Sequence, residues 1–223
     1  MIKKSCQTSI PLEGHCLYNF DLSSPPETIN LYLHGFGQTA EQFSKIIEPI
    51  LTDKDLILNA PFPIPNIFEK KIDFASMRSD FRFTWYFYNK ENDTYLIKMD
   101  SALEYIQTLL QSLNLLDHKF NIIGYSQGGY LAPFLGQALK NVSKVLSCHA
   151  SLREDKLFSE KAQKLPFSFY QINANQDEFI DNELAKERFN LAKEKFSEAQ
   201  FIEVNSKHRI KSETLEAISK ILD

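Results

Sequence analysis

The stretch Gly124-Tyr125-Ser126-Gln127-Gly128-Gly129 follows the apolar residues 120–123 and precedes a segment with helical character. This order predicts a strand, a sharp turn and a helix, with Ser126 on the turn. Such a turn raises a serine hydroxyl above the edge of a sheet, where a substrate can reach it. Glycine is needed two positions from the serine because a larger side chain would collide with the neighbouring strand and helix. Five of the seven glycines in the chain lie in this stretch or in residues 34–37.

Length and composition predict one globular domain over residues 1–223, with 43% hydrophobic and 24% charged residues. The net charge of −4 argues against nucleic acid or an anionic membrane as the main partner. Cys6, Cys16 and Cys148 have no metal-ligand spacing and favour reduced thiols in a cytoplasm. We expect neither a secretory signal nor stable membrane insertion, because no apolar run is long enough.

Short apolar strands alternate with amphipathic helices, which predicts a mostly parallel sheet with helices on both faces and no large cap domain. The expected strands are residues 29–33, 56–58, 120–123, 142–148, 167–174 and 201–204. The expected helices follow Thr39 and Ser126 or cover residues 99–113, 185–196 and 215–222. Thr39 and Gln42 form a capping box, Pro49 should shorten the first helix, and Pro133 should interrupt the helix after Ser126.

Residues 60–96 depart from this alternation because they are rich in proline and aromatic residues. A connection of this length is usually functional or disordered, and its aromatic content argues against disorder. We expect most of the rings to pack on the edge of the sheet. A few of them, Trp85 first, are candidates to line an apolar substrate pocket beside Ser126.

A serine nucleophile needs a histidine to take its proton and a carboxylate to orient that histidine. When the serine occupies a strand-to-helix turn, the acid and then the histidine follow it along the chain, after later strands. Asp177 is the candidate acid because it follows the strand expected at 167–174. Asp181 is better explained as the cap of the next helix, and Asp155 is a weaker candidate in a charged stretch.

His208 is the candidate base, because it is the only histidine after Asp177 and follows the last expected strand. His149 ends the strand expected at 142–148 and is the main rival base. It precedes the acid, however, and so breaks the usual order. An alternative role for His149 is to border the bound substrate.

An oxyanion that forms during acyl transfer needs backbone N–H donors directed at it. Gln127 should supply one donor, because it follows the serine and begins a helix whose dipole favours negative charge. Phe36 is the best candidate for the second donor, in the loop after the strand at 29–33. His34 is expected to brace that loop rather than to act as a base.

Together with Asp177 and His208, three segments resemble the phospholipase/carboxylesterase family of α/β-hydrolases. They are Leu33-His34-Gly35-Phe36-Gly37-Gln38, Thr84-Trp85-Tyr86 and Gly124 to Gly129. The family contains small cytosolic carboxylesterases, lysophospholipases and acyl-protein thioesterases. The resemblance implies the α/β-hydrolase fold and the same roles for the candidate residues, with Trp85 near the acyl pocket. The chain departs from the family pattern at Lys207, where the family usually has glycine.

The sequence therefore predicts a metal-free serine hydrolase that cleaves esters of small or acyl-chain substrates through an acyl-enzyme, with no cofactor. The first alternative keeps the same residues but acts on acyl thioesters or lysophospholipids. A second alternative is a binding protein that retains the fold without turnover, since fold alone does not define function.

Overall fold

The computed structural model describes residues 14–64, 82–89, 91–158 and 164–223. Its centre is a seven-stranded sheet in the order β1-β3-β2-β8-β9-β10-β11. The strands are β1 (Cys16–Tyr18), β2 (Thr28–Leu33), β3 (Asp55–Leu58), β8 (Lys119–Tyr125), β9 (Val142–Cys148), β10 (Leu165–Ala174) and β11 (Phe196–Val204). β1 is antiparallel to β3, and every other pair in this sheet is parallel. The mostly parallel sheet predicted from the sequence is confirmed.

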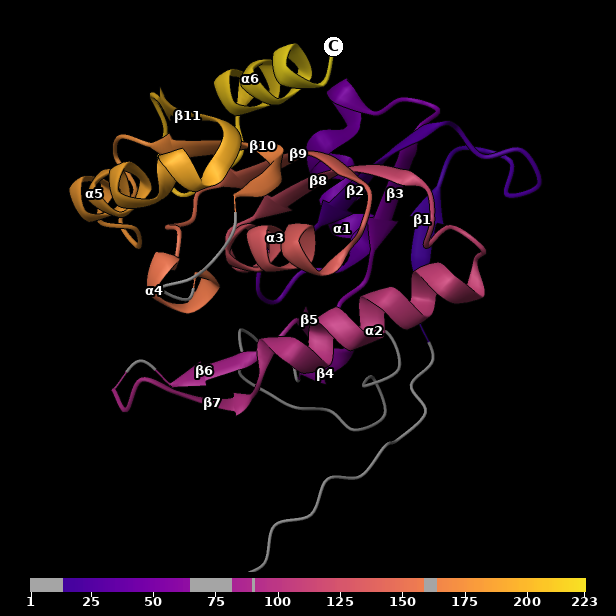
Figure 1. The fold of residues 1–223 in the computed structure, drawn as a ribbon, viewed down its shortest axis with the longest axis horizontal. Helices are drawn as coiled ribbons and strands as arrows, with labels where there is room; N and C mark the ends of the chain where they lie inside the picture. The colour runs from indigo at the N-terminus through magenta and orange to yellow at the C-terminus, as the bar shows by residue number, and fades with distance from the viewer. Residues whose placement is uncertain (1–13, 65–81, 90, 159–163) are drawn as a thin grey trace, which may run out of the picture.

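Helices cover both faces of the sheet (Figure 1). They are α1 (Ala40–Ile47), α2 (Met99–Ser112), α3 (Gln127–Ala138), α4 (Glu154–Leu157), α5 (Asn182–Ala192) and α6 (Ser212–Leu222), with 3₁₀ turns at Glu48–Ile50 and Lys193–Lys195. α2, α3 and α5 share a buried core with one face, around Phe120 and Phe167. α1 and α6 share a second core with the opposite face, around Tyr32 and Ile123. The two cores form because alternate residues of a strand point to opposite faces.

The start and end of α1 follow from local sequence. Thr39 Oγ1 accepts a hydrogen bond from the Gln42 N–H at 3.2 Å, and Gln42 Oε1 accepts one from the Thr39 N–H at 3.2 Å. The predicted capping box is therefore confirmed. α1 gives way after Ile47 to a 3₁₀ turn that contains Pro49, so the predicted shortening of the helix is also confirmed.

Pro133 does not interrupt the helix after Ser126, as the sequence predicted, since α3 continues to Ala138. A proline removes the N–H that would bond to the carbonyl four residues earlier. Here that carbonyl belongs to Gly129, and it accepts a hydrogen bond from the Ser147 hydroxyl at 2.9 Å. The sheet therefore supplies the donor that proline removes.

The helix expected at 185–196 is also shorter than predicted, because α5 ends at Ala192 and Phe196 begins β11. The Phe196 ring packs against the rings of Phe167 and Phe169, with centroids 5.7 and 4.6 Å away. These contacts hold Phe196 beside β10, where Leu165 is its partner in the sheet. Strand pairing therefore overrides the helical spacing of the apolar residues.

The described parts of the 60–96 excursion form two small antiparallel pairs. One joins β4 (Phe62–Ile64) to β5 (Arg82–Thr84), and the other joins β6 (Phe87–Asn89) to β7 (Thr94–Ile97). The β6–β7 pair projects from the main sheet in Figure 1. The Gly37 N–H donates to the Phe83 carbonyl at 2.9 Å, so the excursion is tied to the loop after β2. Residues 65–81 and Cys6 lie outside the described residues.

Candidate active site

Ser126 lies on a strained turn between β8 and α3. Its φ of 51° and ψ of −113° are rare for a residue with a side chain. Its N–H donates to the Cys148 carbonyl at 2.8 Å, which ties the turn to β9. A Cβ at Gly124 would lie 2.1 Å from the Gly128 carbonyl oxygen, and a Cβ at Gly128 would lie 2.3 Å from the Leu33 carbonyl oxygen. Gly124 therefore allows the end of β8 to lie close to α3, and Gly128 allows α3 to lie close to β2.

Three side chains from separate loops join in one line of hydrogen bonds, which we call the Ser126–His208–Asp177 chain. Ser126 Oγ lies 2.8 Å from His208 Nε2. His208 Nδ1 lies 2.7 Å from Asp177 Oδ2. A proton on Nδ1 of the imidazole can be donated to the carboxylate, which leaves Nε2 free to accept the serine proton. Of the residues that the sequence selected by chain order, His208 is thus within hydrogen-bond distance of both Ser126 and Asp177.

Asp177 is held by the loop that follows β10. Its Oδ1 accepts hydrogen bonds from the N–H groups of Phe179 at 2.9 Å and Ile180 at 3.0 Å. The side chain is 1% exposed, so these bonds and His208 replace the water that a carboxylate would otherwise bind. Asp181 caps α5 through the Leu184 N–H, as predicted.

His208 lies in the loop between β11 and α6, where two neighbours fix its backbone. The Tyr125 hydroxyl donates to the His208 carbonyl at 3.0 Å. Burial raises the pKa of Tyr125 to about 12, so this phenol remains a protonated donor at neutral pH. The His208 N–H donates to Glu178 Oε2 at 3.3 Å. Tyr125 belongs to the opening motif, but sequence analysis gave it no role.

The backbone N–H groups of Phe36 and Gln127 have no hydrogen-bond acceptor among the residues that the structure describes. Gln127 is the first residue of α3, where the helix leaves its N–H groups without internal partners. Phe36 lies in the loop after β2. Within the described part of the chain, no acceptor competes with a ligand for these two N–H donors.

His34 braces the loop that contains Phe36, as the sequence predicted. Its Nε2 accepts a hydrogen bond from the Ala60 N–H at 3.1 Å, so its Nδ1 carries the proton and donates to the Gly35 carbonyl at 2.7 Å. Burial lowers the pKa of His34 to about 4, which keeps the ring neutral at pH 7.

The Gln127 side chain connects α3 to the 60–96 excursion, a contact that sequence analysis missed. Its Nε2 donates to the Tyr86 carbonyl at 2.8 Å, and its Oε1 accepts from the Trp85 N–H at 3.0 Å. The Trp85 indole N–H donates to the His34 carbonyl at 2.8 Å, and the ring has no exposed surface. A contact between Trp85 and substrate stays a prediction, since a buried ring meets a ligand only after a neighbour moves.

The polar atoms of His149 face the acid and α6. Its Nδ1 is 3.7 Å from Asp177 Oδ2, and its Nε2 is 3.2 Å from Thr214 Oγ1. Burial, together with the neighbouring His208, lowers the pKa of His149 to about 4, so the ring is neutral at pH 7. It has no exposed surface. A substrate contact for His149 stays a prediction, and sequence analysis gave Thr214 no role.

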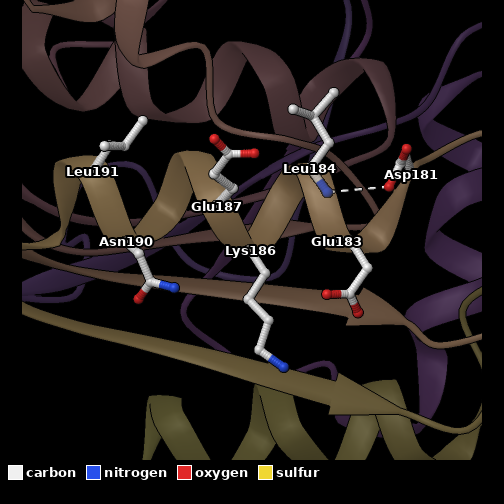
Figure 2. A pocket seen from close by; sticks show the side chains of 7 residues that line it. All are labelled: Asp181, Glu183, Leu184, Lys186, Glu187, Asn190 and Leu191. Atoms are coloured by element: carbon white, nitrogen blue, oxygen red, sulfur yellow. Dashed lines mark hydrogen bonds between the residues drawn. The ribbon is translucent and has the colours of Figure 1, made fainter.

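A separate depression of about 780 Å³ lies on the outer surface of α5 (Figure 2). Its lining residues are Asp181, Glu183, Leu184, Lys186, Glu187, Asn190 and Leu191. None of them belongs to the Ser126–His208–Asp177 chain. Among the described helices, none combines the length and the apolar character that a membrane span requires.

A parallel sheet with a serine at a strand-to-helix turn, an acid after β10 and a histidine after β11 defines the α/β-hydrolase fold. The profile of the serine hydrolase (FSH1) family matches residues 26–214, and the chain belongs to this family. No curated protein sequence is significantly similar to the chain.

Solved structures of esterases and a thioesterase share this fold. Acyl-protein thioesterase 2 from Zea mays superposes with a TM-score of 0.67 at 15% identity, over 95% of this chain and 98% of that chain. A carboxylesterase from Mesorhizobium loti gives 0.67 at 16% identity, over 95% and 97%. The Bacillus cereus carboxylesterase gives 0.63 at 14% identity, over 94% and 92%. These similarities agree with the resemblance noted in the sequence.

Proposed function

We propose that this serine hydrolase is a carboxylic ester hydrolase, with Ser126 as nucleophile, His208 as general base and Asp177 as the acid that orients His208. The observation that carries the proposal is the pair of short contacts, 2.8 Å from Ser126 Oγ to His208 Nε2 and 2.7 Å from His208 Nδ1 to Asp177 Oδ2. A serine hydroxyl without such a base is a weak nucleophile.

In the first half-reaction, His208 Nε2 takes the Ser126 proton as Oγ attacks the ester carbonyl carbon. Asp177 stabilises the imidazolium that forms and stays ionised. His208 then returns the proton to the leaving alcohol, and the acyl group remains on Oγ. In the second half-reaction, His208 deprotonates a water that attacks the acyl-enzyme, and the acid product leaves.

The negative oxygen of each tetrahedral intermediate would accept hydrogen bonds from the N–H groups of Phe36 and Gln127. Preorganised donors of this kind contribute about 10²–10³-fold each to turnover. The two hydrogen bonds of the Gln127 side chain support this role, because they hold the start of α3 against residues 84–86.

The substrate class that we propose is small or acyl-chain esters. Exposed aromatic surface in two of the loops that carry the site supports it, since Phe36 is 45% and Phe179 is 74% exposed. The Phe179 ring lies 5.1 Å from the His208 ring, so apolar surface directly borders the proposed base. Acyl thioesters are the alternative, because the same groups would cleave them and one protein of the same fold is a thioesterase.

The test is hydrolysis of p-nitrophenyl esters of graded acyl length, measured beside acyl thioesters and lysophospholipids. Wild type should turn over the aryl esters, and Ser126→Ala and His208→Ala should each lose turnover by about 10³-fold or more. If only thioesters are cleaved, the ester assignment is wrong. If no member of the panel is cleaved, a binding protein with this fold becomes the better account.

A further inference from the structure

Three potential metal ligands lie close together around Asp177 Oδ2. A ring nitrogen of His149, a ring nitrogen of His208 and a carboxylate oxygen of Asp177 all lie within 4.8 Å of one another. His149 Nδ1 is 3.7 Å and His208 Nδ1 is 2.7 Å from Asp177 Oδ2. In a tetrahedral Zn²⁺ site, bonds of about 2.1 Å place the ligand atoms about 3.4 Å apart. To reach this value, Asp177 Oδ2 must move about 0.7 Å away from His208 Nδ1 and about 0.3 Å closer to His149 Nδ1.

The remaining polar atom of each side chain already has a partner. His149 Nε2 faces Thr214 Oγ1 at 3.2 Å, and His208 Nε2 faces Ser126 Oγ at 2.8 Å. Asp177 Oδ1 accepts two backbone N–H groups. Metal ligands in proteins are usually oriented in this way through the atom that does not bind the metal. The atoms left to converge are therefore the two Nδ1 atoms and Oδ2.

His149 has a buried ring nitrogen that a ligand could satisfy. Its Nδ1 is buried and has no hydrogen-bond partner among the described residues, and a buried polar atom in this state destabilises the fold. Its φ of 51° falls in the left-handed region, which disfavours histidine relative to glycine. The backbone conformation of this position therefore gives no reason for a histidine here.

We propose that His149, Asp177 and His208 bind a divalent transition-metal cation reversibly, with Zn²⁺ as the best match and water as the fourth ligand. Two neutral imidazoles and one carboxylate are the ligand types that Zn²⁺ prefers. A cation on His208 Nδ1 displaces the proton from that atom to Nε2, with no net change in the charge of the ring. Nε2 then donates to Ser126 Oγ and cannot take its proton, so the cation inhibits turnover. This consequence rests on the proposed function.

Isothermal titration of ZnCl₂ into Ser126→Ala tests the site without any need for turnover, because this variant keeps all three ligand atoms. We expect one Zn²⁺ per chain. Adding His149→Asn should weaken Zn²⁺ binding by more than tenfold, and asparagine is chosen because it tolerates a positive φ. Adding Thr214→Val should weaken Zn²⁺ binding by about 10–100-fold. His118→Asn, which removes a histidine outside the cluster, should leave the binding constant unchanged. Absence of binding to Ser126→Ala, or equal binding after His149→Asn, would overturn the proposal.

Inhibition is then measured as the ratio of ester hydrolysis with and without Zn²⁺ within each variant. Wild type should lose turnover in Zn²⁺ and regain it in EDTA, while His149→Asn should need at least tenfold more Zn²⁺ for the same loss. Wild type that hydrolyses esters but binds no Zn²⁺ would refute this inference alone. Zn²⁺ bound with the expected dependence on His149, in a protein that cleaves no ester, would support the metal site and refute the proposed function.

Discussion

Gly128→Ala should impair turnover more than it impairs stability. The new Cβ would lie 2.3 Å from the Leu33 carbonyl oxygen and 2.7 Å from the His34 carbonyl oxygen, whereas ordinary contact begins at 3.4 Å. Both obstacles are backbone atoms, so α3 and the end of β2 must separate by about 1 Å. The N–H groups of Gln127 and Phe36 lie on opposite sides of that gap. A misplacement of this size costs about 100-fold in turnover, while overpacking costs about 1–3 kcal/mol of unfolding free energy.

Gly136→Ala is the matched control, because it adds the same methyl group to the same helix. Gly136 lies near the end of α3 that is farther from Ser126, and its Cβ would lie 2.8 Å from Val145 Cγ2, a side-chain atom of β9. We expect a similar loss of stability in urea and nearly normal kcat for p-nitrophenyl acetate. The reasoning is refuted if folded Gly128→Ala keeps wild-type kcat, or if both variants lose turnover equally.

Three further predictions concern other parts of the site. Asp177→Asn should lower kcat by about 10³–10⁴-fold, because an amide N–H facing Nδ1 moves the His208 proton to Nε2; initial rates above a tenth of wild type would argue against this role. Gln127→Leu leaves the Trp85 N–H unpaired, while the Tyr86 carbonyl keeps its hydrogen bond from the Thr84 hydroxyl. Urea denaturation should therefore show a loss of roughly 1–3 kcal/mol of unfolding free energy, and an unchanged midpoint would argue against this contact. Because the folded-state pKa of His34 is about 4, the unfolded chain binds the proton first as pH falls, and stability is lost below the unfolded pKa. The free energy of unfolding should fall by about 2 kcal/mol between pH 7.5 and 5 because of this residue. His34→Asn should lack this part of the fall, and an equal dependence on pH in wild type and His34→Asn would disprove the prediction.

The position of the site could be predicted because the carboxyl ends of parallel strands meet at one edge of a sheet. Ser126, Asp177 and His208 each follow a strand of that kind, and chain order left one histidine after the acid. The helix caps at Thr39 and Asp181 could also be predicted, because each cap depends on a residue only three positions away.

Other features depend on contacts between segments that are distant in sequence, and no local pattern encodes them. Pro133 stays helical because Ser147 of β9 satisfies the free Gly129 carbonyl. Phe196 joins a strand because the rings of β10 hold it there. The place of His149 beside Asp177 likewise depends on Thr214 of α6. The single-domain organisation over residues 1–223 stays a prediction.

The most direct test of the central claim is labelling with a fluorophosphonate, followed by mass spectrometry of the peptides. Such a probe reacts with a serine that a neighbouring base activates. We predict one adduct per chain on Ser126, no labelling of Ser126→Ala, and much slower labelling of His208→Ala. An intact wild-type protein that stays unlabelled, or that carries its adduct on a different serine, would contradict the account.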